Sequence, residues 1–271
     1  MRLASPLADL VQRVEPTATR SDLVLAKQRL RVMDQIALQW RARTQDCLNG
    51  ASLAKTGAIS ALFAGPSGTG KTMAGQILAN ETRLAFYSID LRRLVSRCLG
   101  ETENNLEALF EETQDAGALL FFDEADTLFG KRGEVPDARE RSANMDADWL
   151  LQRVATYCGI VIFATYLKEA IDPAFLRRLR HVVEFPFPDM AQRVEIWQRI
   201  FPPDTPVEAL DPTRLARLPL SGAAIRDIAR SSAELAASEG KPVRMDHLLL
   251  AARFECAKID GKIDVGQIAR P

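Results

Sequence analysis

Residues 59–72 read ISALFAGPSGTGKT, and this stretch decides the fold class of the chain. Its first six residues form a continuous apolar run of the kind that becomes a buried strand. The remaining eight, GPSGTGKT, match the pattern G-x-x-x-x-G-K-[ST] in full. A helical pattern then covers Thr72–Glu81. A strand, a glycine-rich loop and a helix in this order predict a loop that wraps around phosphate groups.

Each residue type in this loop has a physical reason. Glycines let the backbone curl so that its N–H groups face the phosphates, and the helix N-terminus adds partial positive charge. We expect Lys71 to reach the outer phosphates and the Thr72 hydroxyl to ligate Mg²⁺. The residues predicted to bind ATP are Gly65, Pro66, Ser67, Gly68, Thr69, Gly70, Lys71, Thr72 and Met73.

A second apolar run ends in acidic residues. LLFFDEAD occupies residues 119–126, so that Asp123 and Glu124 follow the run directly. We expect Asp123 to hold Mg²⁺ together with Thr72. Glu124 is expected to polarise the attacking water, because phosphoryl transfer needs positioning and charge compensation more than covalent chemistry. The two motifs together predict Mg²⁺-dependent hydrolysis of ATP.

Strand-like and helical segments alternate on both sides of these motifs. Continuous apolar strands that alternate with helices predict a parallel sheet covered on both faces. FPFPD at 185–189 interrupts the alternation, and only helical patterns follow it. The predicted strands are 59–64, 84–90, 118–124, 159–165 and 181–185; the predicted helices are one from Ser21 onward, then 72–81, 104–114, 142–157, 190–201, 213–217, 222–239 and 245–258.

The fold class that follows is α/β, a P-loop NTPase αβα sandwich with a five-stranded parallel sheet and a small all-α lid domain. We divide the chain into a loosely ordered lead-in and helix at 1–45, a nucleotide-binding α/β domain at 46–187, and a helical lid at 188–271. Trp40 is expected to be a core residue of the first helix.

Composition excludes several other classes of protein. The 271 residues are 47% hydrophobic and 26% charged, with a net charge of −1, so nothing draws the whole chain to nucleic acid or an anionic membrane. The four cysteines lie far apart and indicate neither a zinc site nor a disulfide framework. The N-terminus meets charge and proline too early for a signal peptide, and no apolar run is long enough to span a bilayer. We therefore expect a cytoplasmic protein.

With both motifs placed, the chain resembles an AAA+ ATPase module from about Ser21 to about Lys258. Three stretches, FFDEADTLFGKRGEV (121–135), ERSANMDADWLLQR (140–153) and DPAFLRRLRHVVEFPFPD (172–189), resemble bacterial AAA proteins encoded with extracellular contractile injection systems. The resemblance implies that nucleotide binds between the α/β domain and the lid. It also implies a ring, usually of six subunits, that remodels or assembles a protein complex. The sequence does not name that protein client.

The resemblance also assigns arginines. In such rings one subunit directs arginines at its neighbour's nucleotide, and these positions match Arg178 and Arg180, with Arg177 beside them and the register open by one residue. A basic cluster at the end of a short helix would also suit the helix dipole. In SGAAIRDIAR (221–230), Arg226 resembles a lid arginine that contacts the γ-phosphate, and the alternative is a solvent-facing arginine paired with an acid.

Two positions depart from the family pattern. In FATY (163–166), Tyr166 replaces an asparagine that helps to orient the attacking water, and Thr165 could substitute if its hydroxyl turns toward the site. Slow hydrolysis is therefore expected. In SRCLGETENNL (96–106), Cys98 replaces an aromatic residue that grips substrate in the central pore, which disfavours processive threading.

Two other functions remain as alternatives. Tyr166 and Cys98 favour an ATP-binding structural subunit with little or no hydrolysis, whereas Glu124 and the RRLR cluster oppose it. A nucleic-acid motor or loader is disfavoured by the charge balance. The letters D-E-A-D also occur in RNA helicases, but no second domain of that kind and no basic, aromatic-interleaved stretch accompany them here.

Overall fold

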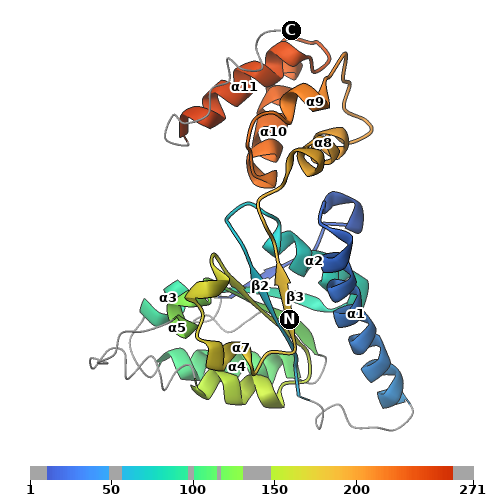
Figure 1. Ribbon diagram of the computed structural model, residues 1–271. Coiled ribbons are helices and arrows are strands. Elements are labelled where there is room, and N and C mark those ends of the chain that lie inside the picture. Colours follow the sequence, from blue (N-terminus) through green and yellow to red (C-terminus); the bar gives the residue numbers. More distant parts are fainter. Residues whose placement is uncertain (1–10, 49–56, 97–100, 115–116, 131–147, 259–271) are drawn as a thin grey trace. The chain divides into compact units, whose positions relative to one another are not determined.

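The computed structural model describes residues 11–48, 57–96, 101–114, 117–130 and 148–258 (Figure 1). The chain forms two compact units, each with its own hydrophobic core. The first contains the sheet and comprises the chain up to Thr19, Ala26–Gly65 and Lys71–Phe185. The second contains the C-terminal helices and comprises Arg20–Leu25, Pro66–Gly70 and the chain from Pro186 onward.

One mixed sheet forms the centre of the first unit. Its strand order is β1-β3-β4-β5-β2-β6, with β1 antiparallel to β3 and every other neighbouring pair parallel. Strands β2 and β5 are buried along their whole length, which explains their unbroken apolar runs. The strands are β1 (Val11–Val14), β2 (Ile59–Ala64), β3 (Ala85–Asp90), β4 (Ala118–Asp123), β5 (Ile160–Thr165) and β6 (His181–Glu184).

The sheet has six strands in the described residues rather than the five that the sequence predicts. The addition is β1, in a segment expected to be a loosely ordered lead-in, and it pairs with Phe86–Ile89. In this four-residue strand Val11 is buried, whereas Gln12 and Arg13 are exposed. Four residues are too few to show the alternation of apolar and polar residues that predicts a strand. Without β1, strand β3 would be an edge strand with unpaired backbone N–H and C=O groups. Strand β1 forms because its backbone can hydrogen-bond to these groups.

Helices cover both faces of the sheet in the first unit. The helix expected from Ser21 begins later, at Lys27, and Ser21 instead lies in the 3-10 turn η1 (Arg20–Asp22) of the second unit. Trp40 is buried, as expected. The helices of the first unit are α1 (Lys27–Leu48), α2 (Lys71–Thr82), α3 (Leu91–Ser96), α4 (Glu101–Gln114), α5 (Asp126–Phe129), a helix over 148–156, and α7 (Pro173–Leu176), with a 3-10 turn η3 at Lys168–Ala170.

Successive side chains of β4 point to opposite faces of the sheet, so this strand contributes to the core on both faces. Phe122 packs with α4, α7 and the helix over 148–156, whereas the neighbouring Phe121 points to the opposite face. There Phe121 contacts Phe86 at 5.8 Å between ring centroids and lies against Gly75 of α2. Helix α1 packs on β2, β6 and α2. The sheet is therefore the middle of three layers (Figure 1).

Replacing Phe163 by alanine is expected to destabilise the first unit by about 3–5 kcal/mol. This fully buried ring lies 5.3 Å from Phe122, 5.3 Å from Phe129 and 5.2 Å from Phe175 between centroids, so its loss leaves a cavity among rigid neighbours. Chemical denaturation measures the change. The control is Leu38→Ala on the exposed side of α1, which should change stability little. A Phe163→Ala loss as small as the control's would contradict the expectation.

The second unit is a helical bundle in which α8, α9 and α10 each begin at a side-chain cap. Asp189 forms a capping box with Gln192, and the side chains of Asp211 and Ser221 accept backbone N–H bonds at the next two helix starts. The core residues include Trp197, Leu215, Ile225, Ile228 and Leu248. The helices are α8 (Met190–Arg199), α9 (Pro212–Leu215), α10 (Gly222–Ser238) and α11 (Met245–Lys258).

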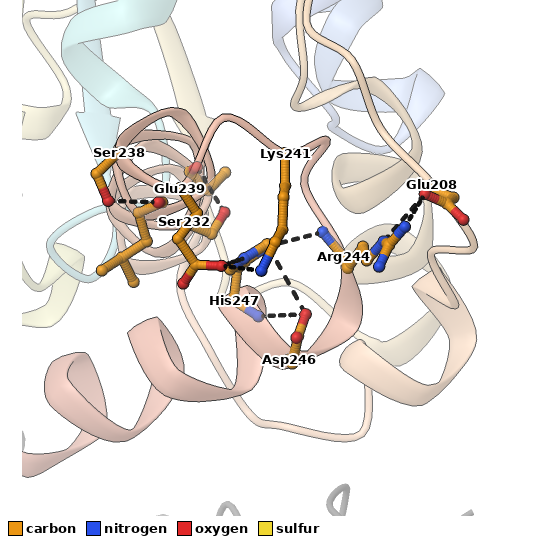
Figure 2. Close-up of polar contacts among 10 residues, drawn as sticks. Glu208, Ser232, Ser238, Glu239, Lys241, Arg244, Asp246 and His247 are labelled. Carbon is orange, nitrogen blue, oxygen red and sulfur yellow. Dashed lines mark hydrogen bonds and ion pairs between the residues drawn. The ribbon is translucent and has the colours of Figure 1, made fainter.

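Polar contacts among Glu239, Lys241, Arg244 and His247 connect α10 to α11, as Figure 2 shows. The Arg244 N–H donates to His247 Nδ1 at 3.1 Å, so the ring proton is on Nε2, which lies 3.5 Å from Glu239 Oε2. Lys241 donates to the same glutamate at 2.8 Å. The Arg244 guanidinium makes two bonds to Glu208, of 2.9 and 2.7 Å. These contacts connect the end of α10, the start of α11 and the segment before α9.

Candidate nucleotide-binding site

The glycine-rich loop leaves the sheet where the strand order reverses. Strand β2 lies between β5 and β6, and the Gly65 N–H donates to the Thr165 carbonyl at 3.1 Å. On the other side, the Phe185 N–H donates to the Ala64 carbonyl at 2.7 Å. Ligands of open α/β sheets bind outside the carboxyl ends of the strands at such a reversal. The topology therefore places the loop at the expected ligand edge.

Gly65 and Lys71 close the base of this loop. Gly65 has φ 154°, and a Cβ there would lie 2.0 Å from the Phe185 carbonyl oxygen, so the position requires glycine. The Lys71 ammonium donates to the Gly65 carbonyl at 2.6 Å. Thr72 is exposed in the first turn of α2. The base of the loop thus carries a cation, a hydroxyl and the helix N-terminus, which suits phosphate and Mg²⁺.

The middle of the loop, Pro66–Gly70, belongs to the second compact unit. Gly68 has φ 76°, and a Cβ there would lie 2.7 Å from Ser221 Oγ. Its carbonyl accepts a bond from the Ala223 N–H at 3.0 Å. The loop therefore lies against the first turn of α10, the helix on which Arg226 is exposed.

The two acids of the second motif lie at the carboxyl end of β4. Asp123 is level with Asp90 on β3, and its Oδ1 accepts the Glu124 N–H at 3.0 Å. Glu124 has φ 58°, a left-handed conformation that costs a non-glycine residue on the order of 1 kcal/mol and is common at functional sites. The turn that follows the strand therefore holds Glu124 in a specific backbone conformation.

Both motifs lie beside the carboxyl end of β5, because the Gly65 N–H donates to the Thr165 carbonyl at 3.1 Å and the Ala125 N–H donates to the Ala164 carbonyl at 2.8 Å. Burial lowers the pKa of Lys71, and the charges of Asp123, Glu124 and Asp126 oppose this shift. Burial raises the pKa of Asp123; the Glu124 N–H bond and the Lys71 charge oppose this, whereas the charges of Glu124 and Asp90 add to it. The lysine of the loop and the acids after β4 are therefore within electrostatic reach of one another.

Asp126 also belongs to this group of charged residues around Lys71, although the sequence motifs do not predict a role for it. Its Oδ1 accepts a bond from the buried Thr165 hydroxyl at 2.9 Å. That hydroxyl also lies 3.3 Å from the Leu167 carbonyl. Tyr166, in contrast, is 53% exposed. The polar group at the end of β5 is thus a threonine held by Asp126. Asp126 is the last residue of the D-E-A-D motif, but its hydrogen-bond partner Thr165 lies 39 residues away, so the sequence does not indicate this contact.

The arginines assigned by resemblance lie on the surface of the first unit. Arg177, Arg178 and Arg180 are exposed between α7 and β6. Arg178 forms an exposed ion pair with Asp148 at 3.4 Å. The Arg180 N–H donates to the Ser60 carbonyl at 3.2 Å, which fixes the backbone beside β2. Their guanidinium groups are therefore placed where another chain could meet them.

Some predicted features fall outside the described residues, namely Cys98 and residues 131–147. Among the residues that the structure describes, no three His, Cys, Asp or Glu side chains gather as a metal site. Mg²⁺ keeps several waters and takes one or two protein oxygens together with phosphate oxygens, so Thr72 and Asp123 fit its requirements. No helix in the described ranges has the length and apolar character needed to cross a membrane.

Comparison with known proteins gives the family of this region. Residues 61–187 match the family described as ATPase family associated with various cellular activities (AAA). These residues form an AAA domain. It starts within β2 and therefore includes the loop, both acids after β4 and the arginine cluster.

Two relatives of the AAA domain show how far the similarity extends. The Uncharacterized AAA family ATPase y4kL of Sinorhizobium fredii is 33% identical over 184 residues, which cover 68% of this chain and 54% of that protein. The Cell division cycle protein 48 homolog of Archaeoglobus fulgidus is 31% identical over 207 residues, which cover 70% of this chain and 28% of that protein. The chain thus spans about half of the first relative and about a quarter of the second.

Replacing Asp123 by asparagine is expected to stabilise the metal-free protein near neutral pH. Because burial raises the pKa of Asp123, folding is penalised wherever this carboxylate is ionised. As the pH falls through the raised folded-state pKa, the folded wild type takes up the proton first and regains that stability. The advantage of Asp123→Asn should therefore shrink on acidification toward the ordinary pKa of aspartate. Chemical denaturation in a chelator tests this, and an advantage that grows on acidification would contradict it.

Proposed function

We propose that this chain hydrolyses ATP to ADP and phosphate with Mg²⁺. The observation that carries the proposal is the convergence of Lys71 with Asp123 and Glu124 at the carboxyl edge of the sheet, within the AAA domain. A lysine on a phosphate loop, a carboxylate for the metal and a second carboxylate for water are the groups that phosphoryl transfer to water needs.

Each group has a separate task in this proposal. Lys71 binds phosphate oxygens, and Thr72 and Asp123 hold the metal. Mg²⁺ supplies neutralisation of phosphate charge when it is bound. Glu124 orients the attacking water and accepts its proton. Thr165, held by Asp126, supplies the hydroxyl at the end of β5.

The proposal extends to a ring of subunits. Arg178 and Arg180 act on the nucleotide of the neighbouring subunit, and Arg226 of α10 acts on the γ-phosphate. Arg178, Arg180 and Arg226 are all exposed to solvent, as this role requires. Such a ring would use ATP to remodel or assemble a protein complex. The sequence resemblance described above makes a contractile injection system our hypothesis for that complex.

The test is ATP turnover as a function of protein concentration, with mass photometry on the same samples. Turnover per subunit should rise as rings form, because each site is completed by its neighbour. Lys71→Met should lose ATP binding and turnover together, since it removes the cation at the base of the loop. A turnover that is independent of assembly would contradict the ring. A Lys71→Met protein that hydrolyses ATP like the wild type would contradict the site.

A second candidate is an ATP-gated structural subunit that hydrolyses little or no ATP. Tyr166 supports it, since the exposed phenol stands where the family has asparagine, and the Thr165 hydroxyl already donates to Asp126. The same titration separates the two functions. Saturable ATP binding with no turnover at any concentration would favour the structural subunit.

A further inference from the structure

The C-terminal half of α1 lies beside the start of β6. The Nε2 atom of His181, the first residue of β6, lies 3.1 Å from Gln39 Oε1 of α1. Arg43 follows Gln39 by four residues, so the two side chains lie on the same face of the helix. Helix α1 thus carries Arg43 one turn beyond this contact, on the face that packs on β6.

The direction of α1 places Arg43 at the amino ends of β2 and β6. Near the start of α1, Arg29 acts on the far end of β6. There the pKa of Glu184 is lowered mainly by the hydrogen bond and the charge of Lys168, and further by the charge of Arg29. Near the other end of α1, the Arg43 Nη1 donates to the carbonyl of Gly57, just before β2, at 2.6 Å. Helix α1 therefore runs antiparallel to β6.

Arg180 lies at the same edge of the first unit, since it directly precedes β6. Its N–H donates to the Ser60 carbonyl at 3.2 Å and lies 3.3 Å from Ser60 Oγ, whereas its side chain is exposed. Burial lowers the pKa of Arg43, and the charge of Arg180 lowers it further. The same two causes lower the pKa of His181. The backbone of Arg180 is thus anchored, and its guanidinium lies within electrostatic reach of Arg43.

Like charges at this edge act on the direction of the Arg180 side chain. Two cations repel each other, and more strongly beside a protein surface than in bulk water. Among the described residues, the charges that shift the pKa values of Arg43 and His181 include no carboxylate. Arg178 differs, because Asp148 of its own subunit pairs with it at 3.4 Å. Repulsion from Arg43 therefore favours positions of the Arg180 guanidinium that point away from α1.

We propose that Arg43 is a positioning residue that turns the guanidinium of Arg180 outward, toward the nucleotide of the neighbouring subunit. The proposal rests on the ATPase function and the ring proposed above. Arg43 stays bonded to the Gly57 carbonyl and touches no nucleotide, so it acts only through Arg180. Its charge makes the packing of Arg180 against α1 unfavourable, and it adds to the positive potential that attracts a neighbour's phosphate groups.

The variant that tests this role is Arg43→Gln, with Arg41→Gln as matched control. Glutamine removes the charge but keeps a hydrogen-bond donor. Arg41 lies on the same helix, is exposed and donates to the Glu81 carbonyl of α2 at 3.3 Å. At saturating ATP under ring-forming conditions, Arg43→Gln should lower kcat about two- to five-fold, the range expected for charges near the surface. Arg43→Lys should stay near the wild-type rate, and Arg41→Gln should match it.

Mixed rings decide whether Arg43 acts across the subunit boundary. Glu124→Gln subunits add no turnover of their own but present Arg180 together with an intact Arg43. Turnover per Arg43→Gln subunit should therefore recover to that of wild-type subunits diluted equally with Glu124→Gln. No recovery would show that Arg43 serves only the fold or its own site, and would contradict positioning in trans.

The outcomes separate the positioning role from the ATPase function. If wild type hydrolyses ATP, Glu124→Gln does not, and Arg43→Gln is as fast as wild type, the positioning role is wrong and the ATPase stands. The role is also wrong if Arg41→Gln loses turnover equally, if Arg43→Lys is no faster than Arg43→Gln, or if only the Kd for ATP changes. If wild type binds ATP but hydrolyses none at any concentration, both proposals are wrong.

Discussion

Replacing Arg178 and Arg180 together by alanine is expected to lower kcat by about 10³–10⁵-fold. An arginine from a neighbouring subunit neutralises charge on the transferred phosphoryl group, and this compensation is lost in the double variant. Both side chains are exposed on the first unit, and Arg178 is paired with an exposed carboxylate from which it can move. Steady-state turnover under ring-forming conditions measures the effect, and ATP affinity should change much less than kcat.

Mixed rings test whether these arginines act in trans. A Glu124→Gln subunit cannot activate water but still presents its arginines, whereas the double arginine variant has an intact water site without a donor. An equimolar mixture should therefore recover part of the wild-type turnover, although neither variant is active alone. The single variants Arg177→Ala, Arg178→Ala and Arg180→Ala then decide the register. No recovery in mixtures that mass photometry shows to be rings would contradict action in trans.

Replacing Glu124 by glutamine is expected to lower kcat by about 10²–10⁴-fold while ATP binding is retained. Glutamine has the same shape but cannot accept the proton of the attacking water. The affinity for ATP should persist, because Lys71 and the loop glycines are unchanged. Parallel measurements of kcat and of the Kd for ATP separate the two effects.

The control for this variant is Glu184→Gln at the end of β6. Glu184 is an exposed glutamate that pairs with Lys168, so its replacement should leave turnover near the wild-type value. Glu124→Gln turnover within a few-fold of wild type would show that another group activates water. Loss of ATP binding in the same variant would instead indicate a damaged loop.

Several elements could be predicted because their signals are local in the chain. The apolar run 59–64 is strand β2, and the glycine-rich loop after it leads into α2, one residue earlier than expected. Helix α11 has the predicted bounds, and α10 ends one residue before the predicted end. Hydrophobic periodicity, glycine spacing and capping residues are properties of neighbours, so a single sequence displays them.

Other elements could not be predicted because their signals are not local. The helical pattern from Ser21 predicts that Leu23 is part of a helix. In the structure Leu23 precedes α1 and is buried in the segment between η1 and that helix. Strand β1 is four residues long and forms on the open edge of β3, which lies more than 70 residues further along the chain. The residues of β1 and β3 do not by themselves predict that these strands pair, because strand order is set by the packing of the whole sheet.

The sequence by itself determined the α/β class and which residue types are available for phosphate chemistry. The spacing of the glycines, the lysine, the threonine and the paired acids is what identifies the phosphate loop and the acidic motif. Only the tertiary structure decided how these groups are engaged. It places Asp126 against Thr165 and Arg92 against Glu124, and it gives Glu124 a left-handed backbone. These contacts join residues from different strands and helices, so they exist only once the sheet has aligned its carboxyl ends at one edge.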